Sequence, residues 1–366
     1  MHIPDGYLGP QTYLPLWGVM GGFWAAALAK LRRTLRLRQV PLLALGAAFS
    51  FVIMMFNVPI PGGTTGHAVG AVLVAILLGP WAATMAVSLA LIIQALLFGD
   101  GGLTAIGANC FNMGVVMPFI GWGVYRLVAG SSPPESARRW IGGAVAGYVG
   151  LCAAAIVTGF EFGIQPFLAR DAAGRPLYCP FGLSLAVPAM ALEHLLVFGF
   201  VEALVTGLVI GFLQRTAPEM LAEAAVPPRA VLWERIYAGG AAVIGVLVLL
   251  SPLGLYLPER FKAGSAWGEW GTEEIRAEIA RQTGEREGYV PRGLEEAERS
   301  GWKAPLPDYA LPGQEEAPLS ALSLTYILSG LLGAIVVAGL ILLLKRGLAG
   351  KDESDAASSL DVPSGR

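Results

Sequence analysis

The most constraining feature of this chain is a long stretch without any charged residue. Residues 40–99 contain no Asp, Glu, Lys or Arg across 60 positions. A transmembrane helix needs about 20 consecutive, mostly apolar residues, so this stretch has room for about three membrane crossings. Residues 59–63 and the Gly79-Pro80 pair supply tight reversals within it. We therefore expect an integral membrane protein.

The rest of the chain extends this expectation. Further uncharged stretches lie at 101–125, 140–160, 236–258 and 317–344. Charged residues make up only 14% of the 366 residues, whereas ordinary globular proteins contain about a quarter. The net charge of −2 argues against a nucleic-acid partner, because no basic domain is present to neutralise phosphates.

Apolar runs separated by Gly and Pro predict an all-α integral membrane fold. A bundle of seven transmembrane helices is expected at residues 13–30, 41–57, 66–79, 80–98, 107–127, 140–160 and 186–213. Two further transmembrane helices, at 236–256 and 321–344, flank a long extracytoplasmic loop at 257–318. Within this loop, residues 272–283 predict a short amphipathic helix that ends at Gly284.

The distribution of basic residues predicts the orientation in the membrane. If the N-terminus lies outside, the inner segments hold 15 Lys and Arg residues, while the short outer loops hold only Arg170 and Arg175. The positive-inside rule therefore places Met1 outside the cell and the C-terminus in the cytoplasm. The loop 257–318 carries eight basic and 13 acidic residues, and long loops translocate largely regardless of charge.

The first two residues form a candidate metal chelator. No cleavable signal segment is expected before them, and the bulky His2 should keep the initiator Met1 in place. The Met1 amine, the deprotonated amide nitrogen of His2 and Nδ1 of His2 can close two fused chelate rings around one cation. His67 is the obvious fourth nitrogen. Four nitrogens in a plane suit Ni(II) or Cu(II), whereas Zn(II) prefers a tetrahedron and Mg(II) or Ca(II) prefers oxygen.

Three stretches of sequence carry a resemblance to a known family. The opening MHIPDGYLGP, the stretch PGGTTGHAVGA around His67 and the later ALEHLLVFGFVEALVTGLV resemble the NikM/CbiM family. Members of this family are the substrate-capture components of energy-coupling factor (ECF) transporters for nickel and cobalt. The later segments SPLGLYLP, GSAWGEWG, GYVPRGLEEA and APLPDYALPG resemble the NikN/PDGLE-type companion, so the two are expected to be fused here.

The resemblance implies a domain plan, a substrate and partners. It implies a metal-binding membrane domain at 1–215, a cytoplasmic linker at 216–235, a two-span companion part at 236–346 and a disordered cytoplasmic tail at 347–366. It implies a nickel ion, or a cobalt ion as the alternative, held by Met1, His2 and His67 in the plasma membrane of a bacterium or archaeon. The implied partners are a transmembrane coupling subunit, ATPase subunits and the lipid bilayer.

Other polar residues have competing interpretations. His194 is a fourth-nitrogen or proton-linked candidate, or it makes an interior hydrogen bond between helices, in which Glu202 is a plausible acceptor. Asp5 is expected to hydrogen-bond within its own turn, and Asp100 and Glu161 to be solvated at outer helix ends. Candidates to hold the second ring nitrogen of His67 are Asn57, Thr64, Thr65 and Asn112.

Two function classes besides transport stay open. An intramembrane metalloenzyme could use Glu193, His194 and Glu202, although HExxH-like spacing is absent from the sequence. The second function class is a metal sensor that does not transport. The sequence also lacks a GxxxxGK[ST] phosphate loop, so ATP hydrolysis must come from partner subunits. The three cysteines Cys110, Cys152 and Cys179 lack CxxC spacing and are expected to be packing residues.

Overall fold

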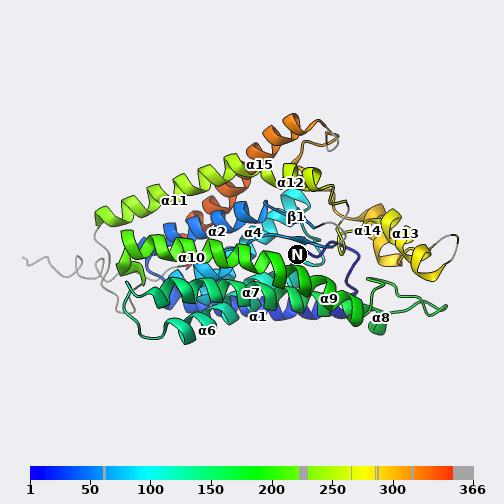
Figure 1. The fold of residues 1–366 in the computed structure, drawn as a ribbon, viewed down its shortest axis with the longest axis horizontal. Helices are drawn as coiled ribbons and strands as arrows, with labels where there is room; N and C mark the ends of the chain where they lie inside the picture. Colours follow the sequence, from blue (N-terminus) through cyan, green and yellow to red (C-terminus); the bar gives the residue numbers. More distant parts are fainter. Residues whose placement is uncertain are drawn as a thin grey trace, which may run out of the picture.

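A computed structural model describes residues 1–60, 63–221, 230–264, 266–284, 286, 288–314 and 317–348 of the chain. It is an elongated bundle of long helices that run roughly along one axis (Figure 1). In a membrane, a helix satisfies every backbone N–H and C=O within itself, which is why long uncharged stretches take this form. The predicted helical membrane architecture is confirmed in its main features.

The N-terminal part contains the first ten α-helices. They are α1 Pro10–Thr34, α2 Val40–Met54, α3 Ala71–Leu78, α4 Pro80–Ile93, α5 Ile106–Phe111, α6 Met117–Ala129, α7 Ala137–Gly163, α8 Gln165–Leu168, α9 Leu183–Glu193 and α10 Gly199–Thr216. Short 3₁₀ turns lie at η1 Leu37–Gln39 and η5 Pro218–Leu221. A two-stranded antiparallel pair, β1 Val58–Pro59 and β2 Thr65–Gly66, lies between α2 and α3. Helix α7 packs against α6, α9 and α10.

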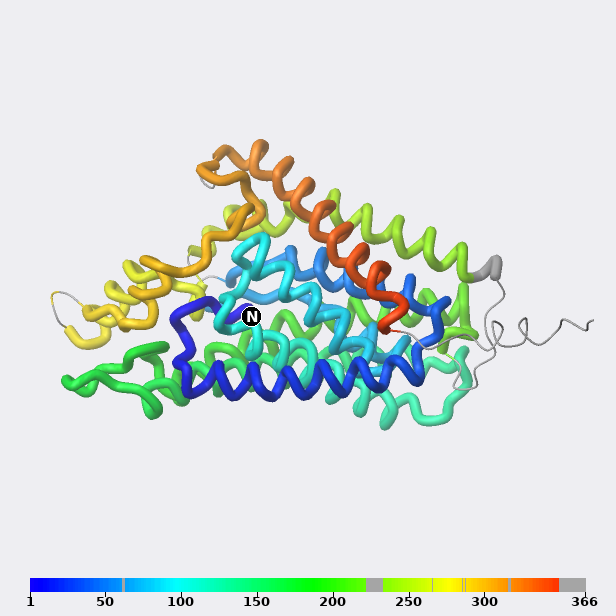
Figure 2. The backbone as a smooth tube through the Cα atoms, turned by 180° about the vertical axis from the view of Figure 1, so that it is seen from behind, coloured from blue at the N-terminus to red at the C-terminus, as the bar shows by residue number. Residues whose placement is uncertain are grey.

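The C-terminal part packs along one side of this bundle. It comprises α11 Ala230–Leu250, α12 Leu253–Phe261, α13 Thr272–Thr283, α14 Arg292–Ser300, η6 Pro307–Tyr309, α15 Leu319–Leu343 and α16 Lys345–Leu348. Helices α11 and α15 both pack on α2. Figure 2 shows α15 lying diagonally across the bundle. The predicted helix at 272–283 is confirmed, and it ends where Gly284 takes a left-handed φ of 72°.

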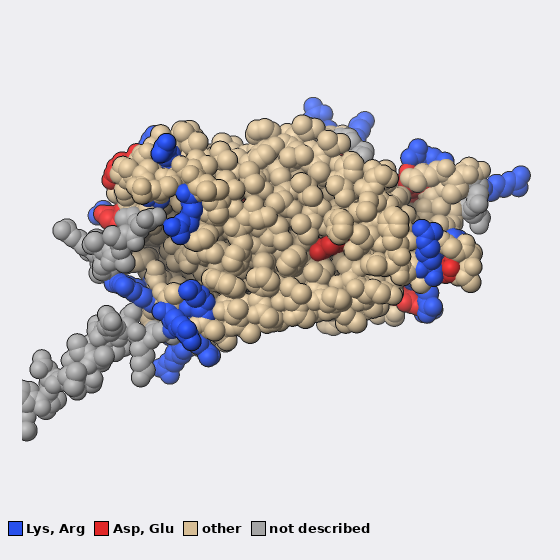
Figure 3. Space-filling view, turned by 90° about the horizontal axis from the view of Figure 1, so that it is seen from below, with Lys and Arg blue, Asp and Glu red and all other residues tan. Residues whose placement is uncertain are grey.

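Seven helices within the described ranges are long and apolar enough to cross a membrane. They are Pro10–Thr34, Leu37–Met54, Pro80–Phe98, Ala137–Leu168, Leu183–Thr216, Trp233–Phe261 and Leu319–Leu343. Figure 3 shows the surface they form, a broad belt with few charges between two charged ends. The chain is therefore a multi-pass membrane protein.

Two of the nine predicted spans differ from the expectation. Residues 66–79 form only α3, eight residues long, which at about 1.5 Å per residue covers less than half of a bilayer core. Its start is delayed to Ala71 because Gly70 adopts a left-handed φ of 71°. Residues 107–127 fall in α5 and α6, which are joined by a π-helical turn.

Within the described part of the chain, three π-helical turns interrupt the bundle, and each begins at a polar residue. They are η2 Gln94–Phe98, η3 Asn112–Val116 and η4 His194–Phe198. Extra residues in a helical turn often mark functional sites. The side chains of Gln94, Asn112 and His194 are all buried, so these turns place polar groups in an otherwise apolar interior.

Candidate metal-binding site

The first residues of the chain run into the interior of the protein rather than along its surface. Met1 is 2% exposed, His2 4% and Ile3 0%. The Ile3 amide donates to Oδ1 of Asn109 at 2.8 Å, and Nδ2 of Asn109 donates back to the Ile3 carbonyl at 3.1 Å. The Gly102 amide donates to the same carbonyl at 2.8 Å. Both polar groups of the Ile3 backbone are therefore paired, which fixes the position of Met1 and His2.

Asp5 makes a second attachment of this segment. Its carboxylate accepts hydrogen bonds from the backbone amides of Leu103 and Thr104, at 3.0 and 2.8 Å. The expectation that Asp5 bonds within its own turn was therefore wrong. The turn itself is made by Gly6 at a φ of 85°, and the carboxylate is left free to bind the 103–104 loop.

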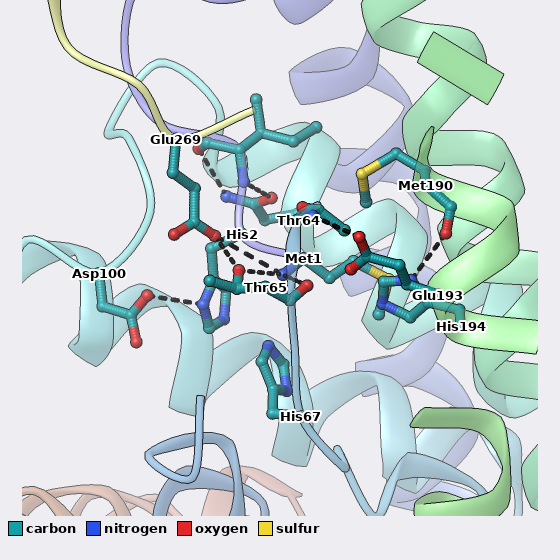
Figure 4. Close-up of polar contacts among 12 residues, drawn as sticks. Met1, His2, Thr64, Thr65, His67, Asp100, Met190, Glu193, His194 and Glu269 are labelled. Atoms are coloured by element: carbon teal, nitrogen blue, oxygen red, sulfur yellow. Dashed lines mark hydrogen bonds and ion pairs between the residues drawn. The ribbon is translucent and has the colours of Figure 1, made fainter. Parts of the chain in front are cut away.

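The Met1 amine lies in a polar environment. It donates to the carbonyl and to Oγ1 of Thr65, both at 3.4 Å, and lies 3.9 Å from Oε1 of Glu269 (Figure 4). Burial lowers the pKa of this ammonium, an effect that the negative charge of Glu269 opposes. Removal from water thus favours the neutral amine, the form that has a lone pair for a metal ion.

His67 lies in an extended segment between β2 and α3. It was expected at a helix end, but α3 begins four residues later at Ala71. Its Nδ1 lies 3.1 Å from the carbonyl oxygen of Ala68, while Nε2 is buried with no hydrogen-bond partner. None of the four predicted side chains thus holds Nδ1. Because a carbonyl only accepts, Nδ1 carries the proton and Nε2 keeps its lone pair. Burial also lowers the pKa of His67 well below its ordinary value.

The His2 ring stacks on His67 and contacts Asp100. The two ring centroids are 4.9 Å apart, with 24° between the ring planes. Nδ1 of His2 lies 2.6 Å from Oδ1 of Asp100 (Figure 4). Asp100 is therefore not simply solvated, as was expected. The other oxygen of Asp100 accepts a 2.6 Å hydrogen bond from the hydroxyl of Tyr309, which comes from the C-terminal part.

Two carboxylates of the Leu183–Thr216 span hold the segment around His67. Oε1 of Glu193 accepts from the Thr64 amide at 2.7 Å. Oε2 of Glu202 accepts from the amides of Val69 and Gly70, at 2.8 and 3.2 Å. Acidic residues within an apolar span indicate a functional role from the sequence alone. Their hydrogen-bond partners here are backbone groups more than 100 residues away in the chain, and no local sequence pattern predicts such pairs.

The remaining polar candidates have different partners from those expected. Nδ1 of His194 lies 2.8 Å from the Met190 carbonyl, one turn earlier on its own helix, so it does not bond between helices through this atom. Glu161, expected in solvent, is 5% exposed and accepts from Nδ2 of Asn112 at 2.7 Å. All three cysteines are buried and free, in agreement with a packing role.

The site is closed by the segment between α12 and α15, and we call residues 266–284, 286 and 288–310 the covering segment. The Trp267 amide donates to the Gly63 carbonyl at 2.8 Å, and Glu269 accepts a hydrogen bond from Oγ1 of Thr65. Farther out, a Cβ atom on Gly6 would lie only 2.6 Å from the carbonyl oxygen of Gly293. The covering segment therefore lies directly against both the N-terminal turn and the residues around the amine.

These positions limit which groups could hold a metal ion. Among the described residues, no cluster of three or more His, Cys, Asp or Glu side chains is arranged as a metal site. Two imidazoles and the chain's own amine do lie together in the interior. A mononuclear site here would therefore draw on backbone as well as side-chain nitrogen, a donor set that suits Ni(II), Cu(II) or Co(II) better than Mg(II) or Ca(II).

Comparisons with known proteins agree with this description. Residues 2–220 match the family model of the CbiM cobalt uptake substrate-specific transmembrane region, and residues 241–349 match the PDGLE domain. The chain is 49% identical to the fused nickel transport protein NikMN of Rhodobacter capsulatus, over 93% of this chain and 96% of that protein. It is 41% identical to the probable fused nickel transport protein LarMN of Lactiplantibacillus plantarum, over 95% and 97%.

A solved structure shares the fold of about two thirds of the chain. The crystal structure of a transition metal transporter matches with a TM-score of 0.57 and 47% sequence identity, covering 65% of this chain and 99% of that one. The matched family models together span most of the chain, in the order expected for a fusion. The chain is thus a membrane protein of the NikMN/CbiM family of nickel and cobalt transport proteins, with a PDGLE domain following its CbiM region.

Proposed function

We propose that this chain is the substrate-binding membrane subunit of an ECF-type ABC importer, which captures Ni(II) in a square-planar, all-nitrogen site. The four nitrogens are the Met1 amine, the His2 amide nitrogen, Nδ1 of His2 and a ring nitrogen of His67. The observation that carries the proposal is the burial of the chain's first two residues against His67. An N-terminal His with no partner role would normally stay in solvent.

Capture requires a small rearrangement of His2. In the structure its ring is stacked on His67 and its Nδ1 faces Asp100. A chelate that includes the His2 backbone nitrogen must use Nδ1, because Nε2 cannot reach the same ion. The ring therefore turns about its Cβ–Cγ bond when the ion enters, while the attachments of Ile3 and Asp5 keep the backbone in place.

The proposed domain plan places metal capture in residues 1–215 and assigns residues 236–346 to the companion part. Of the proposed linker, 216–235, residues 222–229 lie outside the described residues, as does the tail from residue 349 onward. The covering segment is the outer loop of the companion part and assists metal loading, since it contacts both the N-terminal turn and Thr65. In this plan Met1 lies outside the cell and the C-terminus in the cytoplasm, an orientation that the positive-inside rule supports.

The partners of this subunit would be ATPases and a transmembrane coupling subunit. An exposed face of small residues on α1 supports a docking surface for the latter. Gly18, Gly21 and Gly22 have open space where a Cβ atom would stand, and Ala25 and Ala29 are exposed. Small residues let helices from two proteins approach closely in a membrane. Reorientation of the subunit against this partner would then present the ion to the cytoplasm.

Cobalt is the alternative substrate, because the same family includes relatives named for each metal. A 34% identical relative, the cobalt transport protein CbiM of Chlorobium limicola, aligns over 45% of this chain. Relatives named for nickel match over more than 90% of the chain, which supports nickel. A metalloenzyme or a sensor is less well supported, since the relatives are named as metal transport proteins.

The test is a nickel titration of the purified chain in detergent, read by calorimetry and by visible absorption. Replacing His2 with alanine should abolish high-affinity binding, because it removes the ring nitrogen that closes the second chelate ring. Replacing Arg175 with alanine, in an exposed turn, should leave binding intact. Unchanged affinity after His2→Ala would refute the site. Nickel uptake that depends on co-expressed ATPases would separate a transporter from a sensor or an enzyme.

A further inference from the structure

We infer that Tyr309 is a positioning residue for the metal site, and that its hydroxyl sets the metal-free orientation of the His2 imidazole through Asp100. The inference rests on the proposed function and names one residue of the C-terminal part that acts on a metal ligand of the N-terminal part. Tyr309 lies 307 positions from His2 in the sequence but is linked to it through a single carboxylate.

The link consists of short polar contacts between the half-buried carboxylate of Asp100 and the buried side chains of Tyr309 and His2. The Tyr309 hydroxyl donates to Oδ2 of Asp100 at 2.6 Å, and Oδ1 of Asp100 lies 2.6 Å from Nδ1 of His2. Nε2 of Gln94 donates to the same hydroxyl at 2.9 Å. The hydroxyl thus has both a donor and an acceptor, so its hydrogen is directed at Asp100. Because Oδ2 of Asp100 is held by this hydrogen bond, the position of Oδ1 beside the His2 ring is also fixed.

The covering segment brings Tyr309 to this position by pairing with a helix end. The carbonyls of Leu96 and Leu97 lie in the last turn of the Pro80–Phe98 span. Carbonyls at a helix end have no N–H group of their own helix to accept from. The Trp302 indole donates to Leu96 at 3.0 Å, and the Leu306 amide donates to Leu97 at 3.0 Å. On the far side, the Ser329 hydroxyl of α15 donates to the Tyr309 carbonyl at 2.9 Å.

The backbone at Tyr309 is unusual in a way that fits a positioning role. Asp308 and Tyr309 have φ values of 49° and 62°, in the left-handed region that residues with a Cβ atom rarely adopt. Such conformations persist where the surroundings determine them, and they gather at functional sites. The Tyr309 ring is clamped by stacking on Phe98, with centroids 4.7 Å apart. The ring and the backbone together direct the hydroxyl at Asp100.

This arrangement gives the companion part a direct hold on a metal ligand. Without the hydroxyl, Oδ2 of Asp100 keeps a longer hydrogen bond, 3.4 Å from Nε2 of Gln94, and the His2 ring loses a partner with a fixed position. Because Nδ1 of His2 must leave Asp100 to bind the ion, this contact stabilises the metal-free orientation of the ring. We therefore expect Tyr309→Phe to strengthen nickel binding by up to about 10-fold, the effect of one hydrogen bond.

The decisive experiment compares Tyr309→Phe with Tyr326→Phe in the full chain. Tyr326 is a matched control, because it is also a buried tyrosine of the C-terminal part, but its hydroxyl donates to the Met55 carbonyl. The first readout is NMR of ¹⁵N-ring-labelled histidine in the metal-free protein. Tyr309→Phe should shift the His2 ring resonances, and Tyr326→Phe should leave them in place. A His2 signal that is the same in both variants and in the wild type overturns the inference.

A double-mutant cycle tests whether Tyr309 acts through Asp100. Asp100→Ala should itself shift the His2 resonances, and adding Tyr309→Phe to it should change the nickel affinity by less than about twofold. A Tyr309→Phe effect as large in the Asp100→Ala background as in the wild type would overturn the inference, as would an unchanged His2 signal in Asp100→Ala, which leaves the packing of Tyr309 untouched. Because the NMR readout needs no metal, a wild-type protein that fails to bind nickel would refute the proposed function while leaving this test valid.

Discussion

The attachment of the N-terminal segment by Asn109 leads to a quantitative prediction. Replacing Asn109 with alanine removes the acceptor of the Ile3 amide and the donor to the Ile3 carbonyl. A hydrogen bond contributes about 0.5–1.5 kcal/mol to stability, so the pair contributes about 1–3 kcal/mol to holding the segment in place. We expect the metal-free segment of the variant to leave its site. Since 1.4 kcal/mol corresponds to about a tenfold change, nickel affinity should fall by about 5- to 150-fold.

The assay is competition for Ni(II) against a chromogenic chelator, together with labelling of the N-terminal amine in the metal-free protein. The amine of Asn109→Ala should react faster than that of the wild type, because it spends more time in solvent. Asn57→Ala is a suitable control, since Oδ1 of Asn57 has no hydrogen-bond partner in the structure. If Asn109→Ala kept its nickel affinity within twofold and its amine stayed protected, the reasoning that a fixed backbone prepares the chelator would be refuted.

Three further predictions concern protons, the chain terminus and the covering segment. Nickel affinity should fall as the pH is lowered, because the ligating amine must be unprotonated. Burial lowers the pKa of the Met1 amine, so the fall should come at a lower pH than the pH at which a free Met-His peptide loses nickel. Calorimetry at several pH values checks this. Acetylation of the N-terminus should abolish binding without altering any side chain, and binding that survives complete acetylation, verified by mass spectrometry, would contradict the site. Gly293→Ala should loosen the covering segment and raise its hydrogen exchange, because the new Cβ atom would lie 2.4 Å from Cδ1 of Tyr178; exchange equal to that of wild type would argue against this contact.

The helical architecture was largely predictable because it depends on composition. A long uncharged stretch has few stable forms in a membrane, and Gly and Pro mark its reversals. The exceptions arise where geometry overrides composition. Residues 66–79 are apolar enough for a span, but the left-handed Gly70 and the pairing of β2 with β1 leave only eight residues for α3. The sequence pattern contains the glycine but does not say which conformation it takes.

The grouping of Met1, His2 and His67 was predictable, and its surroundings were not. The three residues were proposed as ligands because an amine next to histidine can chelate a metal ion and histidines are rare in this chain. Asn109, Asp100 and Tyr309 were missed as partners, since nothing in their spacing relates them to residues 1–3. Their roles depend on contacts between distant segments, such as the covering segment against the 96–102 turn. Those contacts are set by tertiary packing.

The electronic spectrum of the nickel-loaded chain tests the central claim most directly. Purified protein carrying one equivalent of Ni(II) should be yellow and diamagnetic, because four nitrogens in a plane produce a low-spin ion, and substituting His67 should change or abolish the band. A pale, paramagnetic complex typical of six-coordinate Ni(II) would contradict the account, and so would a yellow complex that persists unchanged when the N-terminal amine is blocked.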